Sequence, residues 1–320
     1  MSYPPEVGEI RVGTSGWQYP SGAGTWNGIF YPARRPKGFD ELAYYAERFD
    51  TVEVNSTFYR MPEAPMSAAW VRRTPACFTF AIKLFQKFTH PDMYLARGAA
   101  DWDVTRTDFD LFRAGIEPVA AAGRLAAVLV QFPASFHADP DTEGYLEWLL
   151  AGLAQYPVAV ELRHKSWSDR GDSSRALLAA TRAAWAVIDE PKFSGSIEQS
   201  LDSGAGSLSP GSPSPLAYFR FHGRNAAQWW DHAHRDDRYN YLYSAAELAP
   251  FAGAARELSR RERKVLMYFN NHFSAKSVAN ASVLKHDLGQ IIPAHYTSAM
   301  LRTYPELEGI VEAERTLLEE

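Results

Sequence analysis

The sequence predicts a single (β/α)₈ barrel of the TIM type, with long loops at the carboxyl ends of its strands. Short apolar runs bounded by turn residues alternate with amphipathic segments, which is typical of parallel βαβ units. Eight such units fit within the 320 residues of the chain. The runs cover residues 10–13, 51–55, 78–83, 125–131, 158–163, 184–189, 216–222 and 265–270.

The segments between the runs carry apolar residues at helical spacing, and we expect these stripes to pack against the sheet. A doubly wound open sheet is the rival fold. It usually has a glycine-rich dinucleotide loop after its first strand, and Gly13-Thr-Ser-Gly16 does not match that fingerprint. The three stripes are Phe109, Phe112, Ile116 and Val119; Leu146, Leu149 and Leu153; and Leu248, Phe251, Ala255 and Leu258.

One domain is expected over residues 1–320, with a core at about 9–288 and a C-terminal extension at 289–320. Residues 190–215 are rich in Ser, Gly and Pro, a composition that cannot bury a core, so we expect a flexible loop there. Long loops that follow strands lie at the catalytic face of a barrel. The other two such loops cover residues 14–37 and 84–105.

The composition is that of an ordinary globular protein, 46% hydrophobic and 22% charged. A net charge of -5 gives no global basic excess of the kind that general nucleic-acid binders show. Neither a signal peptide nor a membrane span is recognised, so we expect a cytoplasmic protein with no membrane partner. The single cysteine, Cys77, excludes an internal disulfide and a multi-cysteine zinc site, and we expect a buried, unreactive thiol.

Polar residues gather at the ends of the predicted strands. Alternation puts Val52 and Val54 on one face and Glu53 and Asn55 on the other, and the other runs divide in the same way. If the apolar face packs on the helices, the polar face points into the barrel mouth. A buried ion network is the structural alternative, but burying so many polar groups stabilises a core poorly, which favours a ligand or catalytic site. The converging residues are Glu53, Asn55, Lys83, Gln131, Glu161, Arg163, Asp189, Arg220, His222, Tyr268 and Asn270.

The first functional hypothesis is an enzyme that acts on a small anionic substrate, a phosphorylated sugar or a nucleotide-like molecule. Glu53 and Glu161 are the candidate general bases, and His222 is a candidate proton shuttle; Lys83 and Asp189 complete the catalytic set. Aromatic walls suit a sugar ring or a nucleobase, and arginines suit a phosphate or carboxylate. The predicted ligand-binding residues are Trp17, Asn55, Tyr59, Gln131, Arg163, Trp167, Arg220, Arg224, Tyr268 and Asn270.

Two alternatives remain open. One is a metal-assisted isomerase or hydrolase with oxygen and imidazole ligands, an analogy at the level of the fold only. The cations in the same mouth weigh against a metal, so we expect no cofactor. The other is a non-catalytic module for a nucleotide or single-stranded nucleic acid, disfavoured by the acidic net charge. The metal ligands would be Glu53, Glu161, Asp189 and His222. The stacking cleft would use Arg163, Arg220 and Arg224 with Trp167, Trp229 and Trp230. The sequence leaves the oligomeric state open.

Seven short motifs stand in order along the chain: Gly13-Thr-Ser-Gly-Trp17, Phe30-Tyr-Pro32, Glu53-Val-Asn-Ser-Thr-Phe-Tyr59, Gln131-Phe-Pro133, Glu161-Leu-Arg-His-Lys-Ser-Trp167, Arg220-Phe-His-Gly223 and Tyr268-Phe-Asn-Asn271. Together they closely resemble the YecE-like family, a bacterial and archaeal domain-of-unknown-function family. The resemblance covers about residues 9–288 and implies a TIM-barrel-type fold. It implies no established activity.

Overall fold

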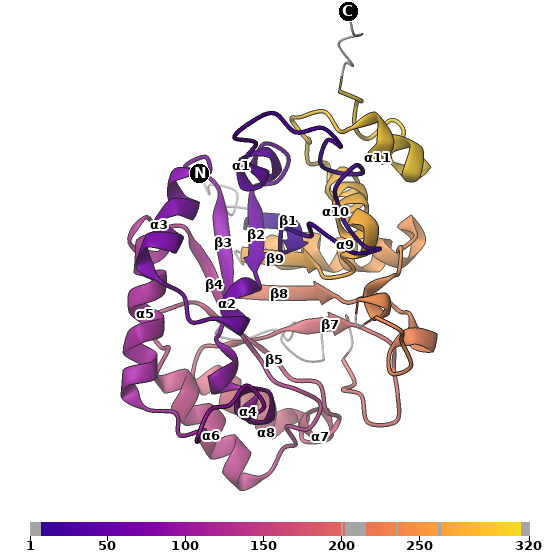
Figure 1. Cartoon of the computed structure of the whole chain (residues 1–320). Coiled ribbons are helices and arrows are strands. Elements are labelled where there is room, and N and C mark those ends of the chain that lie inside the picture. The colour runs from indigo at the N-terminus through magenta and orange to yellow at the C-terminus, as the bar shows by residue number, and fades with distance from the viewer. Residues whose placement is uncertain (1–7, 200, 202–215, 235, 262–263, 315–320) are drawn as a thin grey trace, which may run out of the picture.

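A parallel β-sheet forms the centre of the molecule. The computed structural model describes residues 8–199, 201, 216–234, 236–261 and 264–314, and within them the sheet has nine strands in the order β6-β5-β4-β3-β2-β1-β9-β8-β7 (Figure 1). The strands are β1 (Ile10–Ser15), β2 (Thr51–Val54), β3 (Thr79–Lys83), β4 (Leu125–Gln131), β5 (Val158–Glu161), β6 (Ala184–Trp185), β7 (Val187–Asp189), β8 (Leu216–Phe221) and β9 (Lys264–Phe269).

The two strands at the ends of this order, β6 and β7, belong to one continuous segment. β6 pairs with β5, and β7 pairs with β8. Between them, the backbone N–H of Ala186 donates to the carbonyl oxygen of Val160 at 2.8 Å. The sheet therefore wraps into a nearly closed barrel. The predicted fold class is confirmed, with the run at 184–189 divided into two short strands.

Helices surround the strands (Figure 1). Three of the longer ones begin at a capping box, in which the first residue and the residue three positions later satisfy each other's backbone N–H groups: Thr105 with Asp108, Asp139 with Thr142, and Ser244 with Glu247. The helices are α1 (Glu41–Ala46), α2 (Ser56–Tyr59), α3 (Ala64–Arg72), α4 (Pro91–Leu95), α5 (Arg106–Ala121), α6 (Pro140–Ala151), α7 (Ser166–Asp169), α8 (Gly171–Ala180), α9 (Ala245–Ser259), α10 (Lys276–Asp287) and α11 (Ser298–Thr303), with 3₁₀ turns at Gln86–Phe88, Ala226–Gln228, Asp237–Tyr239, Phe273–Ala275 and Pro305–Leu307.

The core has two layers, as the strand alternation predicts. The apolar strand faces, such as Val52 and Phe80, join the helix stripes in one large buried cluster, and all three predicted stripes are buried. The opposite strand faces form a second, smaller cluster, in which alanines from β3 to β6 combine with large side chains from β8 and β9 such as Tyr218 and Leu266. Small residues suit the narrow interior of an eight-stranded barrel, which side chains fill completely.

One expectation about the segments outside the barrel needs correction. Cys77 is exposed, because β3 begins only at Thr79 and the cysteine lies in the turn before it. Described residues of the predicted C-terminal extension pack on the main core: Tyr296 and Met300 are fully buried. Of the loop expected to be flexible, residues 200 and 202–215 lie outside the described residues, so its mobility stays a prediction. In the part of the chain described here, no helix is both long enough and apolar enough to cross a membrane.

Candidate functional site

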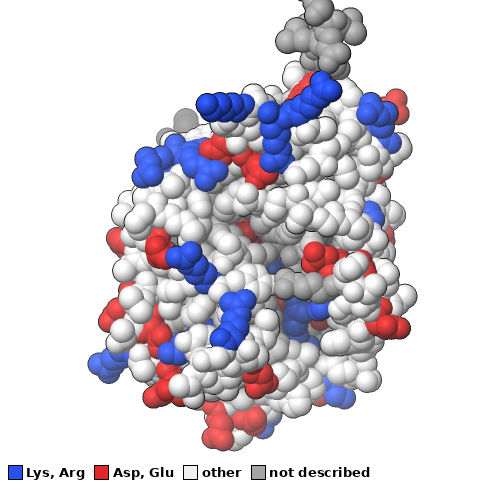
Figure 2. Space-filling view, viewed as in Figure 1, with Lys and Arg blue, Asp and Glu red and all other residues white. Residues whose placement is uncertain are grey.

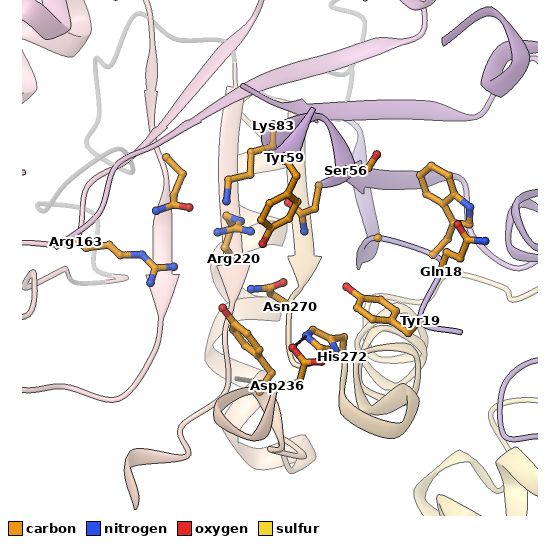
Figure 3. A pocket seen from close by; sticks show the side chains of 15 residues that line it. Gln18, Tyr19, Ser56, Tyr59, Lys83, Arg163, Arg220, Asp236, Asn270 and His272 are labelled. Atoms are coloured by element: carbon orange, nitrogen blue, oxygen red, sulfur yellow. Dashed lines mark ion pairs between the residues drawn. The ribbon is translucent and has the colours of Figure 1, made fainter. Parts of the chain in front are cut away.

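A cavity of about 370 Å³ opens at the carboxyl ends of the barrel strands (Figure 3). The chain enters it directly from β1, where Gly16 has a φ of 88° that favours glycine and turns the backbone towards Trp17. The cavity is lined by Gly16, Trp17, Gln18, Tyr19, Asn55, Ser56, Tyr59, Lys83, Gln131, Arg163, Arg220, Asp236, Tyr239, Asn270 and His272. Eight of these were predicted as site residues: Trp17, Asn55, Tyr59, Lys83, Gln131, Arg163, Arg220 and Asn270.

Arg220, on β8, lies at the floor of the cavity and is held from beneath by two glutamates. Its Nε and Nη2 donate to Oε2 and Oε1 of Glu53 at 2.9 and 2.7 Å. Its Nη1 donates to Oε2 of Glu161 at 2.5 Å. Ser15 and Tyr218 each donate a further hydrogen bond of 2.7 Å to Glu53. The guanidinium is thus held in a fixed orientation by carboxylates on β2 and β5.

The two glutamates lie beneath the cavity and do not line it. Both are fully buried. Burial, the largest single influence, would raise their pKa values. The Arg220 charge, the hydrogen bonds to Glu53 and the Arg163 charge beside Glu161 together outweigh it, so the pKa of Glu53 is lowered and that of Glu161 lies well below its usual range. A carboxylate with a low pKa and with its oxygens engaged in hydrogen bonds is a weak proton acceptor. The geometry therefore favours a positioning role over the predicted role of general base.

His222 is also buried below the cavity lining. Burial, followed by the Arg163 charge, lowers the pKa of His222 to about 3, so the ring is neutral at neutral pH. Its Nε2 lies 3.1 Å from Nη2 of Arg163, and its Nδ1 lies 3.0 Å from Nδ2 of Asn270. The ring connects two residues that do line the cavity, which gives it a supporting position rather than direct access to a ligand.

Lys83, at the end of β3, is the cation with the most unusual surroundings. Its Nζ lies 4.0 Å from the centroid of the Phe58 ring, and among the described residues it has neither a hydrogen bond nor an ion pair. Burial, together with the charge of Arg220, lowers the pKa of Lys83 to about 7. The side chain extends into the cavity beside Tyr59 and Arg220 (Figure 3). A substantial fraction of this lysine is therefore a free amine at neutral pH.

Arg163 leads to a residue that the sequence reasoning missed. Its Nε donates to Oε1 of Glu161 at 2.7 Å, and its Nη1 lies 3.5 Å from Oε2 of Glu190. Glu190 is 7% exposed, and its Oε2 has no hydrogen-bond partner among the described residues. Burial raises the pKa of Glu190, opposed by the Arg163 charge. Its position directly after the predicted strand end at Asp189 was the available signal.

Four predicted site residues lie away from the cavity. Trp167 is fully buried, and its Nε1 donates to the carbonyl oxygen of Phe136 at 2.8 Å. Arg224 pairs with Asp189 through two hydrogen bonds of 2.8 Å, so neither reaches the cavity. Tyr268 lies deeper in the barrel, where its Oη is 2.7 Å from Oγ1 of Thr51. Two members of the stacking cleft expected for single-stranded nucleic acid, Trp167 and Arg224, thus lie away from the cavity.

Several lining residues come from loops and had not been predicted. Tyr19 stacks on His272 with ring centroids 4.2 Å apart, and Tyr239 lies 5.0 Å from the same imidazole. Oδ1 of Asp236 lies 3.9 Å from Nε2 of His272 (Figure 3). These residues form one wall of the cavity. His272 lies two positions beyond the predicted strand end Asn270.

Arginines engage the carboxylates among the predicted metal ligands. Glu53 and Glu161 are both bound to Arg220, and Asp189 is bound to Arg224. Across the described ranges, no group of three His, Cys, Asp or Glu side chains is placed to hold a metal ion. On the face shown in Figure 2, Lys and Arg are interspersed with Asp and Glu, without a broad basic field.

Comparison with known proteins gives the same fold. The chain is 28% identical to the UPF0759 protein YunF of Bacillus subtilis (strain 168) over 282 residues, 85% of this chain and 92% of that protein. A DUF72 family protein of Thermotoga maritima MSB8 has a TM-score of 0.71 and 32% identity, covering 88% of this chain and 100% of that one. A DUF72 family protein of Enterococcus faecalis V583 has a TM-score of 0.73 and 24% identity, covering 88% and 95%.

A family model described as "Protein of unknown function DUF72" matches residues 11–301. The match extends past residue 288, where we had expected the family resemblance to end. An uncharacterised family with a barrel fold, the coarser part of the predicted resemblance, is confirmed; the name YecE-like stays a prediction. The chain belongs to the DUF72 family.

Proposed function

We propose that the protein is an enzyme that acts on a small anionic substrate, of the sugar phosphate or nucleotide type, with the Lys83 amine as the proton acceptor. The observation that carries this proposal is the position of Lys83. It lines the cavity, has no hydrogen-bond or ion-pair partner among the described residues, and has a pKa lowered to about 7. A general base is most effective when its pKa lies near the working pH.

The charge arrangement favours an anion. Arg163 and Arg220 line the cavity, whereas their partners Glu53 and Glu161 lie behind them. An anionic group in the cavity would thus meet the guanidinium and amine groups before these two carboxylates. Asp236 also lines the cavity, but its Oδ1 lies 3.9 Å from Nε2 of His272. Arginine suits phosphate or carboxylate because its planar group presents several fixed donors.

The proposed step is a simple proton transfer. A C–H or O–H bond of the bound substrate breaks, its proton forms a new N–H bond on Lys83, and the electron pair stays on the substrate. Arg163 would stabilise the negative charge that develops. The buried charges of Glu161 and Glu53 favour the ammonium form of Lys83 and so support its gain of a proton. In this scheme both glutamates act through the cations they hold.

Proton NMR in D₂O would test the proposal with a panel of sugar phosphates and nucleotides. Wild type is expected to exchange a carbon-bound proton of one substrate or to convert it, with a rate that rises as the pH passes about 7. Lys83→Met should reduce that rate by about 10²–10⁴-fold, the usual contribution of a general base.

Lys165→Met is the matched control, because it removes an exposed lysine that does not line the cavity. It should leave the rate unchanged. Reductive ¹³C-methylation followed by an NMR titration measures the pKa of Lys83 without any substrate. A pKa near the ordinary lysine value, or full turnover in Lys83→Met, would refute the proposed role.

A further inference from the structure

The cavity continues past Lys83 into a second compartment of about 620 Å³. Both compartments are lined by Lys83 and Arg163, and also by Tyr59, Gln131 and Tyr239. The cationic groups proposed to hold an anion therefore stand at the junction of two adjoining spaces. A ligand bound there through its anionic group can extend a second part into the outer compartment.

The outer compartment has aromatic walls. Trp230 is 68% exposed and lies 5.8 Å from the Phe193 ring, between centroids. The neighbouring Trp229 is almost completely buried and makes edge contacts with His222 and Tyr239. A buried tryptophan thus fixes the backbone from which an exposed one projects at the cavity. A large exposed aromatic ring beside a cavity is a suitable surface for stacking.

Glu190 supplies a polar group to the same compartment. Oε2 of Glu190 is buried and has no hydrogen-bond partner among the described residues, although Arg163 Nη1 is 3.5 Å away. A buried acceptor without a donor costs about 1–3 kcal/mol. A ligand with an N–H or O–H group at this position would satisfy it.

We infer that the outer compartment binds a planar ring with a hydrogen-bond donor, such as an amino-substituted nucleobase, which stacks on Trp230 and donates to Glu190. This inference rests on the proposed function, because it assigns the second part of the same anionic ligand. It distinguishes between the two substrate types above and selects a nucleotide over a simple sugar phosphate.

Isothermal titration calorimetry with four probes would test the inference. Ribose 5-phosphate carries only the anionic part, AMP adds a planar ring with an amino group, and purine riboside 5′-monophosphate adds the ring without that group. Trehalose 6-phosphate adds a second ring that is not planar. AMP should bind about 5- to 150-fold more tightly than ribose 5-phosphate, the range that base stacking on an aromatic side chain gives. Purine riboside 5′-monophosphate should lie between them.

Two variants test which residues cause the tighter binding of AMP. Trp230→Ala, at an exposed position, should abolish the advantage of AMP and leave ribose 5-phosphate unchanged. Trp148→Ala is the matched control, since this tryptophan is also exposed but lies outside both compartments. Glu190→Leu should abolish the difference between AMP and purine riboside 5′-monophosphate.

The outcomes separate the inference from the proposed function. Binding of ribose 5-phosphate with no gain for AMP overturns the inference alone. If trehalose 6-phosphate binds more tightly than ribose 5-phosphate and AMP does not, the second part of the ligand is a sugar ring and not a planar ring. An AMP gain that survives Trp230→Ala overturns the assigned compartment. No binding of either ribose 5-phosphate or AMP overturns the inference together with the proposed anion site.

Discussion

Arg11 at the amino end of β1 and Lys83 at the carboxyl end of β3 are both largely buried cations, but the fold uses them differently. Nη1 of Arg11 donates to the carbonyl oxygens of Asp50 and Cys77, each at 2.8 Å, and so fastens the segments that lead into β2 and β3. Lys83 has no comparable partner in the described part of the chain. At the base of the barrel, Arg11 thus has a structural role, whereas at the mouth Lys83 is available to a ligand.

The comparison shows how a charge network can be distinguished from a site. Burying a cation is unfavourable at either end of the barrel. At the base, Lys285 is buried too, but its Nζ lies 3.5 Å from Oδ1 of Asp50. At the mouth, Arg220 is completely satisfied by two glutamates while Lys83 faces open space. An unfavourable burial that neither a hydrogen bond nor an ion pair within the described residues offsets is the mark of a group kept for a ligand.

Arg220→Met is expected to cause the largest loss in the free energy of unfolding. It leaves Glu53 and Glu161 buried without their partner, and breaking a buried pair in this way costs about 3–5 kcal/mol. Arg11→Met at the base should cost less, about 1–3 kcal/mol, because it removes hydrogen bonds to carbonyl groups and leaves no buried charge. Urea denaturation of the three proteins at pH 7 measures both differences. Equal losses would mean that the two ends of the barrel are not distinct in the way described.

The stabilities of Arg220→Met and Arg11→Met should also differ in their dependence on pH. Arg220 holds the pKa of Glu53 and Glu161 below their unfolded values, so the stability they contribute is present above about pH 4.3 and is lost as the pH falls through their folded pKa values. Without Arg220, burial instead favours protonation of both groups. The deficit of Arg220→Met relative to wild type should therefore narrow between pH 7 and pH 4. That of Arg11→Met should narrow much less; parallel curves for the two would contradict the account.

The sequence predicted the barrel well because the barrel depends on local patterns. Alternation in residues 51–55 and 78–83 identifies the helix-facing and interior-facing side chains, and short runs between helices predict parallel strands. The division of residues 184–189 between two strand neighbours was not predictable, since hydrogen-bond partners far along the chain leave no local pattern. The exposure of Cys77 depends on where β3 begins, and strand ends are the least certain feature of such predictions.

The site was predicted in part, for a related reason. Alternation identified the interior faces on which Lys83, Arg163 and Arg220 lie, and all three line the cavity. It does not give the height of a side chain along the barrel axis, so Glu53 and Tyr268 were expected in the mouth but lie below it. The aromatic loop residues, among them Tyr19, Tyr239 and His272, were missed because loops have no periodicity to read.

The smallest changes in stability are expected when one lysine is removed at each end of the barrel. Lys83→Met should stabilise the protein by about 0.5–2 kcal/mol at pH 7, as substitutions that relieve a strained functional site commonly do. Lys285→Met should change the stability by about 1 kcal/mol or less, because its partner Asp50 is 39% exposed in its side chain and the pair is weak. The urea midpoint should therefore rise in Lys83→Met and stay nearly constant in Lys285→Met.

The pH dependence of the gain in Lys83→Met separates a functional amine from a packing effect. Between the folded pKa of about 7 and the unfolded value of about 10.4, the unfolded state binds more protons at Lys83 than the folded state, so wild type gains stability as the pH rises through this window. The unfavourable charging of Lys83 is fully present only below about pH 7. The advantage of Lys83→Met should therefore be largest near pH 6 and shrink towards pH 10. An advantage that stays constant over that range would mean that better packing explains it, and Lys83 would then resemble the structural cations at the base.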